Sequence, residues 1–416
     1  MKTGLASTDI AAAPVRVMLL LGSLSGGGAE RVAVNLANRC DPTRVDLRLA
    51  LLRRTGPYLA EIDSGRVDAP APRTVSLGGF ARAPGDIARM IRARQPEVLM
   101  SFGMGVNLLA WLALRGLGEN RPRWLCREDN NSDAQIDNLL GNPLGRRLIR
   151  AATRRVHRSA DGVVAVARDL ASTFEGRVGS SGRLRTIYNP IDVARIERSA
   201  LEASVEVPER PFIVAAGRLE RQKGYDLLIE AFARSRAASA MDLVILGQGS
   251  LEDALKRQAA ALGVGDRVRF PGFQANPWAW FARARLFVLA SRWEGFGNVV
   301  AEALACAVPV LVTDCDFGPR EQVVHGQSGW VVPSGDAGAL TAALDRLLGE
   351  PDLRGRLSAG GKARSAAFDL PVIAAAYTDL FVDLAMARSA SPIAAPPTAW
   401  RAPGPQGPET APVARA

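Results

Sequence analysis

Two glutamates eight positions apart, Glu294 and Glu302, are the residues whose type and spacing indicate chemistry most directly. Glu294 lies in a glycine-rich segment after a predicted strand, and Glu302 lies in the helix predicted over 298–306. At about 3.6 residues per turn, eight positions leave both carboxylates on nearly the same side. A carboxylate accepts hydrogen bonds from two adjacent hydroxyls, and amides at a helix start meet phosphate or sugar oxygens. The pattern favours a hydroxyl-rich ligand; the alternative is a first-turn charge at Glu294 and a surface residue at Glu302.

Two cations, Arg218 and Lys223, lie in a second loop, beside Gly217 and Gly224. The loop joins a predicted strand to a predicted helix, and the amino end of a helix adds a partial positive charge. This arrangement suits a diphosphate. Two solvated loop charges would produce the same pattern, so the pair alone leaves both interpretations open.

A third glycine-rich loop, at residues 26–28, opens the first predicted helix. Glycine has no side chain there to keep a ligand from the main chain. The loop is not a phosphate-binding loop of the Walker type, because no Gly-Lys-Ser/Thr follows it. A fourth loop, at residues 313–321, is rich in turn formers and would close the same end of the sheet.

The elements that must position these loops alternate between short apolar runs and longer amphipathic stretches, which is typical of parallel βα units. Strands are predicted at 15–21, 45–52, 98–102, 123–126 and 162–165, and then again at 212–216, 242–246, 268–270, 286–289 and 308–312. The fold class is therefore α/β, with two successive open parallel sheets. Ligands of such sheets bind at the carboxyl ends of the strands, and each of these loops follows a predicted strand.

Length and composition support two globular domains. A chain of 416 residues is too long for one ordinary core, and with 48% hydrophobic and 23% charged residues it is too apolar to be disordered. Four cysteines without a CxxC pair, and only two histidines, give no zinc pattern. No apolar run approaches the roughly 18 to 20 residues that span a bilayer. We expect a cytoplasmic protein with a disordered tail at 391–416, which holds seven prolines.

Positive charge is concentrated in the first half of the chain. Residues 1–200 hold 30 Lys and Arg against 19 Asp and Glu, whereas residues 201–416 hold 22 against 23. Six arginines crowd a predicted helix after Pro143, which also carries an apolar set formed by Leu144, Leu148, Ile149 and Val156. Such a helix suits an anionic membrane or a lipid diphosphate, and a solvated basic face is the alternative. Nucleic acid is disfavoured, because few aromatic residues are interleaved for base stacking.

Taken together, five motifs in order resemble the retaining GT-B glycosyltransferases of family 4 over roughly residues 15–388. The motifs are Gly-Gly-Ala-Glu-Arg at 27–31, Asn-Pro-Ile-Asp at 189–192, Gly217-Arg218 with Lys223-Gly224, the pair Glu294 and Glu302, and Gly-Pro-Arg-Glu at 318–321. The resemblance implies an acceptor-binding Rossmann-like domain at 14–190, completed by a helix at about 371–388. It implies a nucleotide-sugar-binding Rossmann-like domain at 191–370.

The resemblance also implies roles for individual residues. Arg218 and Lys223 would stabilise the diphosphate leaving group without a metal or another cofactor, and Glu294 would face the donor sugar. Glu302 would hold the ribose hydroxyls. The remaining donor-binding residues would be Gly27, Gly28, Gly295, Phe296, Gly297, Asn298 and Val299. Many relatives place a histidine in the first lobe near the donor sugar, where this chain has Arg127-Glu128-Asp129-Asn130.

The expected reaction is transfer of a hexose or N-acetylhexosamine from a nucleotide diphosphate sugar. On family grounds, UDP is the expected leaving group. The expected acceptor is a lipid-diphosphate-linked or oligosaccharide precursor at the cytoplasmic face of the plasma membrane, to which the basic lobe would be drawn. The alternatives are a glycosyltransferase with a soluble acceptor and a non-catalytic nucleotide-sugar-binding protein. A dinucleotide oxidoreductase is disfavoured, because no complete glycine fingerprint is present.

Overall fold

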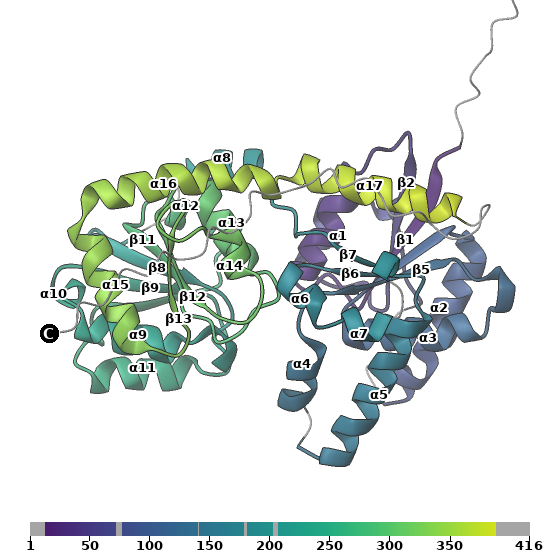
Figure 1. The fold of residues 1–416 in the computed structure, drawn as a ribbon, viewed down its shortest axis with the longest axis horizontal. Coiled ribbons are helices and arrows are strands. Elements are labelled where there is room, and N and C mark those ends of the chain that lie inside the picture. The colour runs from purple at the N-terminus through teal and green to yellow at the C-terminus, as the bar shows by residue number, and fades with distance from the viewer. Residues whose placement is uncertain (1–12, 72–76, 140, 179–180, 203–206, 388–416) are drawn as a thin grey trace, which may run out of the picture.

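The computed structural model describes residues 13–71, 77–139, 141–178, 181–202 and 207–387, which form two α/β lobes (Figure 1). The strands of the first lobe are β1 (Val15–Leu21), β2 (Val45–Leu51), β3 (Val67–Asp68), β4 (Val98–Phe102), β5 (Arg123–Glu128), β6 (Gly162–Ala165) and β7 (Leu184–Thr186). They form one sheet in the order β3-β2-β1-β4-β5-β6-β7, with every pair parallel. Inner strands such as β1 are almost wholly buried, as their continuous apolar sequence predicts.

Helices cover this sheet and connect its strands. They are α1 (Gly28–Arg39), α2 (Leu77–Arg94), α3 (Met104–Arg115), α4 (Ser132–Leu139), α5 (Pro143–Ser159), α6 (Arg168–Ser172) and α7 (Glu175–Val178), with short 3-10 turns between, among them η1 (Pro57–Glu61). Helix α5 begins where the sequence predicts, because Pro143 suits a first turn and the Asn142 side chain accepts from the Leu144 amide at 3.0 Å. Helices α4 and α5 project from the body of the lobe (Figure 1).

The second lobe repeats the plan with six strands. These are β8 (Phe212–Ala216), β9 (Asp242–Leu246), β10 (Val268–Gly272), β11 (Leu286–Leu289), β12 (Val310–Asp314) and β13 (Trp330–Pro333), in the parallel order β10-β9-β8-β11-β12-β13. Its helices are α9 (Tyr225–Arg234), α10 (Ala237–Ala240), α11 (Glu252–Ala261), α12 (Trp278–Phe281), α13 (Asn298–Ala305), α14 (Pro319–Gln322), α15 (Ala337–Gly349) and α16 (Pro351–Ser365).

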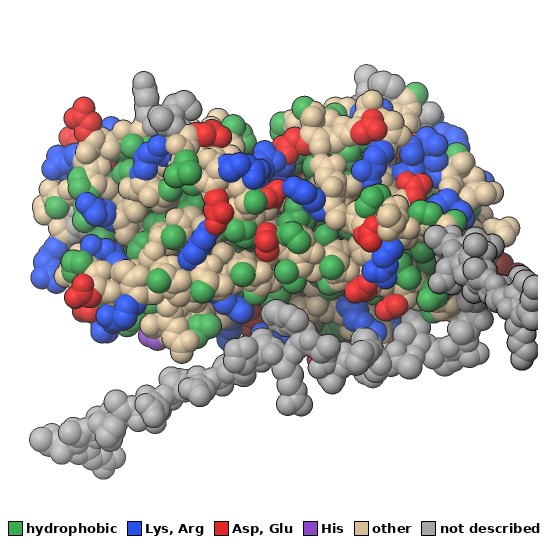
Figure 2. All heavy atoms as spheres, turned by 90° about the horizontal axis from the view of Figure 1, so that it is seen from above, with side chains coloured by type: hydrophobic (Ala, Val, Ile, Leu, Met, Phe, Trp, Pro, Cys, Tyr) green, Lys and Arg blue, Asp and Glu red, His purple; other side chains and the backbone are tan. Residues whose placement is uncertain are grey.

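The chain passes between the lobes twice. It leaves the first through Asn189 and Pro190 into α8 (Val193–Ala200), and it returns after α16 through α17 (Leu370–Met386), which packs on α1 and β1 (Figure 1). An isolated bridge between Ile191 and Asp369 brings the two passages together. Seen from the side of α16 and α17, the outline is notched between the lobes, and basic and acidic side chains are interspersed (Figure 2).

The predicted fold class, two parallel-sheet α/β lobes, is confirmed. Several strands begin and end where the sequence indicates, β1, β8 and β9 among them. The strand predicted at 308–312 lies two residues later, and β3, β7 and β13 were not predicted. The predicted tail at 391–416 lies outside the described residues. No helix in the described part of the chain has the length and apolar character needed to span a membrane.

Candidate active site

The predicted site residues follow the central strands of the two sheets, where the order of the strands reverses. In the second lobe the order of strands reverses between β8 and β11, and in the first lobe it reverses between β1 and β4. A reversal of this kind leaves a crevice at the carboxyl ends of the two central strands. Arg218 and Lys223 follow β8, Glu294 follows β11, and Gly27 and Gly28 follow β1. The topology therefore gathers the loops predicted to bind a ligand.

Lys223 and Glu294 form a buried ion pair at the centre of this region. Lys223 Nζ lies 2.5 Å from Glu294 Oε1, and the two side chains are only 12% and 6% exposed. The Ser291 hydroxyl donates to the same carboxylate oxygen at 2.7 Å, and the Glu294 amide donates to the Asp316 carbonyl at 3.0 Å. Because both the carboxylate and its main chain are held, Glu294 has little freedom to turn away. The pair supplies a fixed ammonium and a fixed carboxylate within one hydrogen bond of each other.

Arg218 is the exposed member of the cationic loop. Its guanidinium donates to Gln222 Oε1 at 3.3 Å, and among the described residues it forms no ion pair. Gln222 in turn donates to the Trp293 carbonyl at 2.9 Å, which ties the loop after β8 to the loop after β11. The structure therefore leaves the charge of Arg218 open to an anion, while that of Lys223 is compensated by Glu294.

Glu302 lies in the second turn of α13, and its carboxylate accepts from the Trp278 indole N–H at 3.1 Å. Burial raises the pKa of Glu302, whereas this hydrogen bond and the nearby charge of Arg31 act in the opposite direction. The helical spacing argument for the two glutamates is wrong. The helix starts at Asn298, and Gly297 before it has φ 81°, so Glu294 stands on a loop that helical periodicity does not describe.

The loop at 294–299 also meets the first lobe. A Cβ built on Gly295 would lie 1.7 Å from the carbonyl oxygen of Asp129, so only glycine allows this approach. Asn298 accepts at its Oδ1 from the Asn189 amide at 2.7 Å, and its Nδ2 would lie 3.1 Å from a Cβ on Gly28. The predicted residues Gly28, Gly295 and Asn298 therefore lie together where the lobes meet.

Phe296 and Val299, two other predicted donor-binding residues, have side chains that pack against the protein core. The ring of Phe296 is 2% exposed and packs against Tyr188 and Phe368 at centroid distances of 5.7 and 5.5 Å. Val299 is half-buried against the apolar core. At Phe296 the main chain of the loop, rather than the buried ring, is what a ligand can contact.

The carboxylate of Glu30 lies against Gly27. A Cβ on Gly27 would lie 2.1 Å from Glu30 Oε2, because the Glu30 carboxylate folds back over the first turn of α1. Burial raises the pKa of Glu30, and main-chain hydrogen bonds at Glu30 and Gly27 oppose the shift. The first-lobe wall therefore carries a carboxyl group at this point, whereas Arg218 and Lys223 lie on the second-lobe side.

Several residues of the site carry no sequence signal that would have identified their roles. Ser291 and Gln222 are common loop residues, and Trp278 begins a one-turn helix 24 positions before Glu302. Asp129 had a signal, because it follows a predicted strand in the run Arg127-Glu128-Asp129. The contacts that Arg127 and Asp129 make could not be predicted from their place in the sequence alone.

One group of possible metal ligands lies in the part of the chain that the structure describes. Cys126, Glu128 and His157 lie close together and are buried. The Glu128 carboxylate, however, is engaged by Asn107 at 2.9 Å, Ser132 at 2.9 Å and His157 at 3.0 Å. Burial, followed by the charge of Glu128, raises the pKa of the Cys126 thiol well above its usual range. We interpret the cluster as a hydrogen-bonded network in the core.

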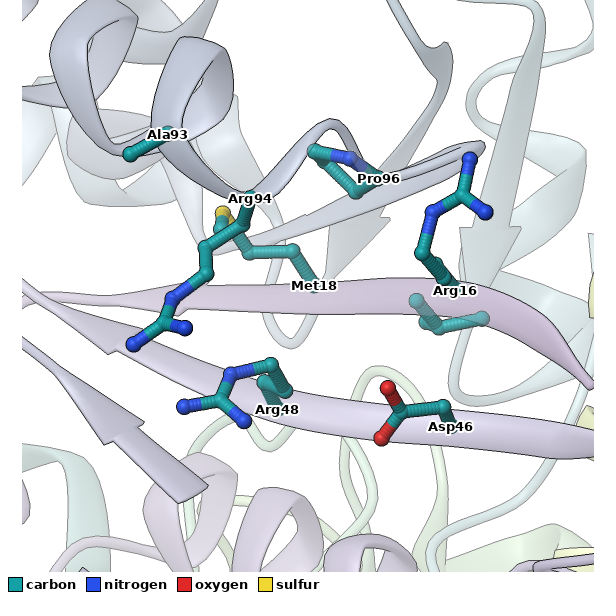
Figure 3. A pocket seen from close by; sticks show the side chains of 8 residues that line it. Arg16, Met18, Asp46, Arg48, Ala93, Arg94 and Pro96 are labelled. Atoms are coloured by element: carbon teal, nitrogen blue, oxygen red, sulfur yellow. The ribbon is translucent and has the colours of Figure 1, made fainter. Parts of the chain in front are cut away.

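A separate hollow of about 200 Å³ lies over the first halves of β1 and β2 (Figure 3). Arg16, Arg48 and Arg94 line it, but each is paired with a carboxylate, Glu97 for Arg16 and Asp68 for the other two. The loops of the site follow the opposite ends of the strands. This hollow is therefore distinct from the candidate site.

Family models match both lobes. The model described as Glycosyltransferase Family 4 matches residues 26–195, and the model described as Glycosyl transferases group 1 matches residues 198–364. Among curated relatives, the N-acetylgalactosamine-N,N'-diacetylbacillosaminyl-diphospho-undecaprenol 4-alpha-N-acetylgalactosaminyltransferase of Campylobacter jejuni is 35% identical over 195 residues. That match covers 47% of this chain and 52% of the relative, so the chain spans about half the length of the Campylobacter protein.

A longer match joins the chain to the lipopolysaccharide core biosynthesis glycosyltransferase LpsE of Rhizobium meliloti, at 28% identity over 80% of this chain and 89% of that one. Among solved structures, HepE of Anabaena in complex with UDP has a TM-score of 0.71 at 20% identity, covering 88% of this chain and 99% of its own. WaaG, a glycosyltransferase involved in lipopolysaccharide biosynthesis, has a TM-score of 0.69 at 16% identity, with coverage of 88% and 99%. At these identities the two structures establish the fold.

Proposed function

Because the chain belongs to glycosyltransferase family 4 and has its GT-B fold, we propose that it transfers a hexose or N-acetylhexosamine from a nucleotide diphosphate sugar. The observation that carries the proposal is the ion pair of Lys223 and Glu294, 2.5 Å apart at the strand reversal of the second lobe. Beside it lies Arg218, which forms no ion pair among the described residues. The donor is a UDP sugar, transfer retains the configuration at the anomeric carbon, and no metal takes part.

The chemistry follows from where charge develops. As the glycosidic bond to the donor breaks, negative charge grows on the departing diphosphate, and cations fixed in advance stabilise it. Arg218 contacts this charge directly, and Lys223 does so from its position against Glu294. The Glu294 carboxylate keeps Lys223 in place and accepts from hydroxyls of the donor sugar. Glu302, beside the Trp278 N–H, accepts from the ribose hydroxyls.

The acceptor is proposed to be a lipid-linked or polysaccharide precursor. The names of the two relatives, from Campylobacter jejuni and Rhizobium meliloti, point to undecaprenyl-diphosphate-linked and lipopolysaccharide acceptors. Helix α5 supports this choice, because Leu144 and Leu148 are 63% and 61% exposed on its outer face. Its exposed arginines that form no ion pair among the described residues are Arg147, Arg154, Arg155 and Arg158. Exposed leucines among arginines suit an anionic membrane, and we place the enzyme at the cytoplasmic face.

The proposal is tested by nucleotide diphosphate release from a panel of UDP and GDP sugars, with and without polyprenyl-diphosphate-linked sugars. Release from one donor that rises with acceptor supports a transferase and identifies the donor. Binding of UDP without release in any setting would instead favour a non-catalytic nucleotide-sugar-binding protein.

Flotation with anionic vesicles separates the lipid-linked acceptor from a soluble one. The native chain is expected to float with the vesicles at low salt and to be released at high salt, because salt screens the arginines. A variant with Leu144→Ser and Leu148→Ser should float less. Absence of vesicle binding at low salt would favour a soluble acceptor.

A further inference from the structure

Arg127 is a fully buried cation that links three separate parts of the chain. It is the fifth residue of β5 and is 0% exposed. Its Nε donates to the Tyr377 hydroxyl at 2.9 Å on α17, and its two Nη atoms donate to Asn189 and to Asp129. The guanidinium also lies 4.9 Å from the centroid of the Phe102 ring. Each nitrogen of this guanidinium therefore donates to a different residue: Tyr377 on α17, Asp129 just after β5, and Asn189 in the first passage between the lobes.

A buried ion pair of this kind is poor evidence for a purely stabilising role. Removing two charges from water costs several kcal/mol per ion, and apolar residues of similar volume often replace such pairs without loss of stability. Burial raises the pKa of Asp129, with the charge of Arg127 acting against the shift. What the pair provides that an apolar core would not is a fixed direction for the groups it holds.

Asp129 and Asn189, which Arg127 holds where the lobes meet, both contact the loop at 294–299 of the second lobe, called the donor loop below. The Asp129 carbonyl lies against Gly295, and the Asn189 amide donates to Asn298 at 2.7 Å. Asn298 is the first residue of α13, which also carries Glu302, and Gly295 directly follows Glu294. The side chain of Arg127 thus holds two residues that contact the donor loop at two positions, Gly295 and Asn298.

We propose that Arg127 is a positioning residue for glycosyl transfer. It fixes Asp129 and Asn189 so that the lobes close with Gly295 and Asn298 in register, which places the donor loop against the first lobe. It does not contact the reacting atoms. The kinetic part of this inference rests on the proposed function, whereas the closure of the lobes does not.

The test compares Arg127→Met, Arg127→Met with Asp129→Asn, and Arg121→Met as a matched control. Arg121 forms a two-point ion pair with Asp161 in the same lobe, at 2.6 and 3.1 Å, away from the donor loop. Three quantities are measured for each folded variant: kcat with the donor found for the native chain, the Kd of UDP, and the radius of gyration by small-angle scattering with and without UDP.

In Arg127→Met, kcat should fall about 100-fold, the order of loss expected for misalignment of about 1 Å. The Kd of UDP should change less than about threefold, because Arg218, Lys223 and Glu302, the residues proposed to bind the nucleotide, all lie in the second lobe. The radius of gyration should exceed that of both the native chain and Arg121→Met. Adding Asp129→Asn should restore thermal stability without restoring kcat.

Native kcat in Arg127→Met, or recovery of kcat in the double variant, would overturn the inference, since Arg127 would then only neutralise Asp129. An unchanged radius of gyration would overturn it as well. If the native chain turned over no donor, the proposed function would fail, and the scattering comparison would still decide whether Arg127 holds the lobes together.

Discussion

The main-chain carbonyl of Asp129 in the first lobe lies directly over Gly295 in the second, where a Cβ would be 1.7 Å from the oxygen. Any side chain at position 295 must therefore separate the lobes or shift the loop that carries Glu294. We expect Gly295→Ala to reduce kcat/KM by about 100-fold, because misalignment of about 1 Å costs that order of rate. Steady-state kinetics with the native donor measure the loss.

The control for this change is Gly355→Ala in the same lobe. Gly355 lies within α16 and has nothing within 4 Å of a built Cβ, so alanine should leave activity unchanged and add about 0.5–1 kcal/mol of stability. Equal activity in the two alanine variants would show that the contact between Asp129 and Gly295 does not matter for transfer.

Donor binding should depend on pH through Glu302. Burial raises the pKa of this carboxyl, so it gains a proton at a higher pH than an ordinary glutamate as the solution is acidified. A protonated Glu302 accepts less well from ribose hydroxyls. The KM for the donor should therefore rise as pH falls, beginning above the ordinary value of 4.5, and Glu302→Gln should raise KM and flatten the profile. A profile that is the same in both proteins would remove Glu302 from donor binding.

Glu321 joins the lobes outside the donor loop. Its carboxylate is 7% exposed and accepts from the amides of Arg168 and Asp169 and from the Tyr188 hydroxyl, each at 2.9 Å. Glu321→Ala leaves these donors unsatisfied and should lower the free energy of unfolding by about 2–3 kcal/mol.

Two further variants make the Glu321 prediction specific. Tyr188→Phe removes one hydrogen bond and should cost about 1 kcal/mol. Asp379→Ala breaks a surface pair in which Asp379 is 61% exposed, and it should cost less than about 0.5 kcal/mol. Denaturant unfolding measures all three, and a Glu321→Ala loss no larger than the Asp379→Ala loss would contradict the prediction.

Acid stability should depend on Glu61, which pairs with Arg31 at 2.5 Å and with Arg195 at 2.6 Å. Burial works against ionisation of Glu61, but the hydrogen bonds from these two arginines outweigh it and lower its pKa to about 2 from 4.5. A lowered carboxyl pKa stabilises the fold above the unfolded value, and this contribution is lost as pH falls from 4.5 toward 2. Urea unfolding of Glu61→Gln should show a shallower decline over that interval, and parallel declines would contradict the assignment.

Much of the fold could be predicted because inner strands of a parallel sheet are long apolar runs. Strand β1 is buried at nearly every position, and its bounds agree with the predicted 15–21. Strands β3, β7 and β13 were missed because they are two to four residues long and polar or half-buried. Edge strands such as β3 are covered on one side only, so selection for apolar residues is weak there.

The site was predictable as a set of loops but not as a set of contacts. Parallel topology requires that the loops after β8 and β11 share one edge of the sheet, which brings Lys223 near Glu294 although 71 positions separate them. That the two side chains form an ion pair depends on how Ser291 and Asp316 orient the loop, and no spacing shows this. Contacts between lobes, such as Asn189 with Asn298, depend on the relative placement of two sheets.

The central claim is that the cation of Lys223, fixed by Glu294, stabilises the departing diphosphate. It is tested most directly by acceptor-stimulated nucleotide diphosphate release from the native chain, Lys223→Met and Glu294→Gln. The control is Lys256→Met, which breaks an exposed pair with Glu252 at 2.7 Å. We predict a loss of about 100- to 1000-fold in kcat for both site variants, the order found when one preorganised group is removed, and native rates for the control. Release by folded Lys223→Met at the native rate would contradict the account.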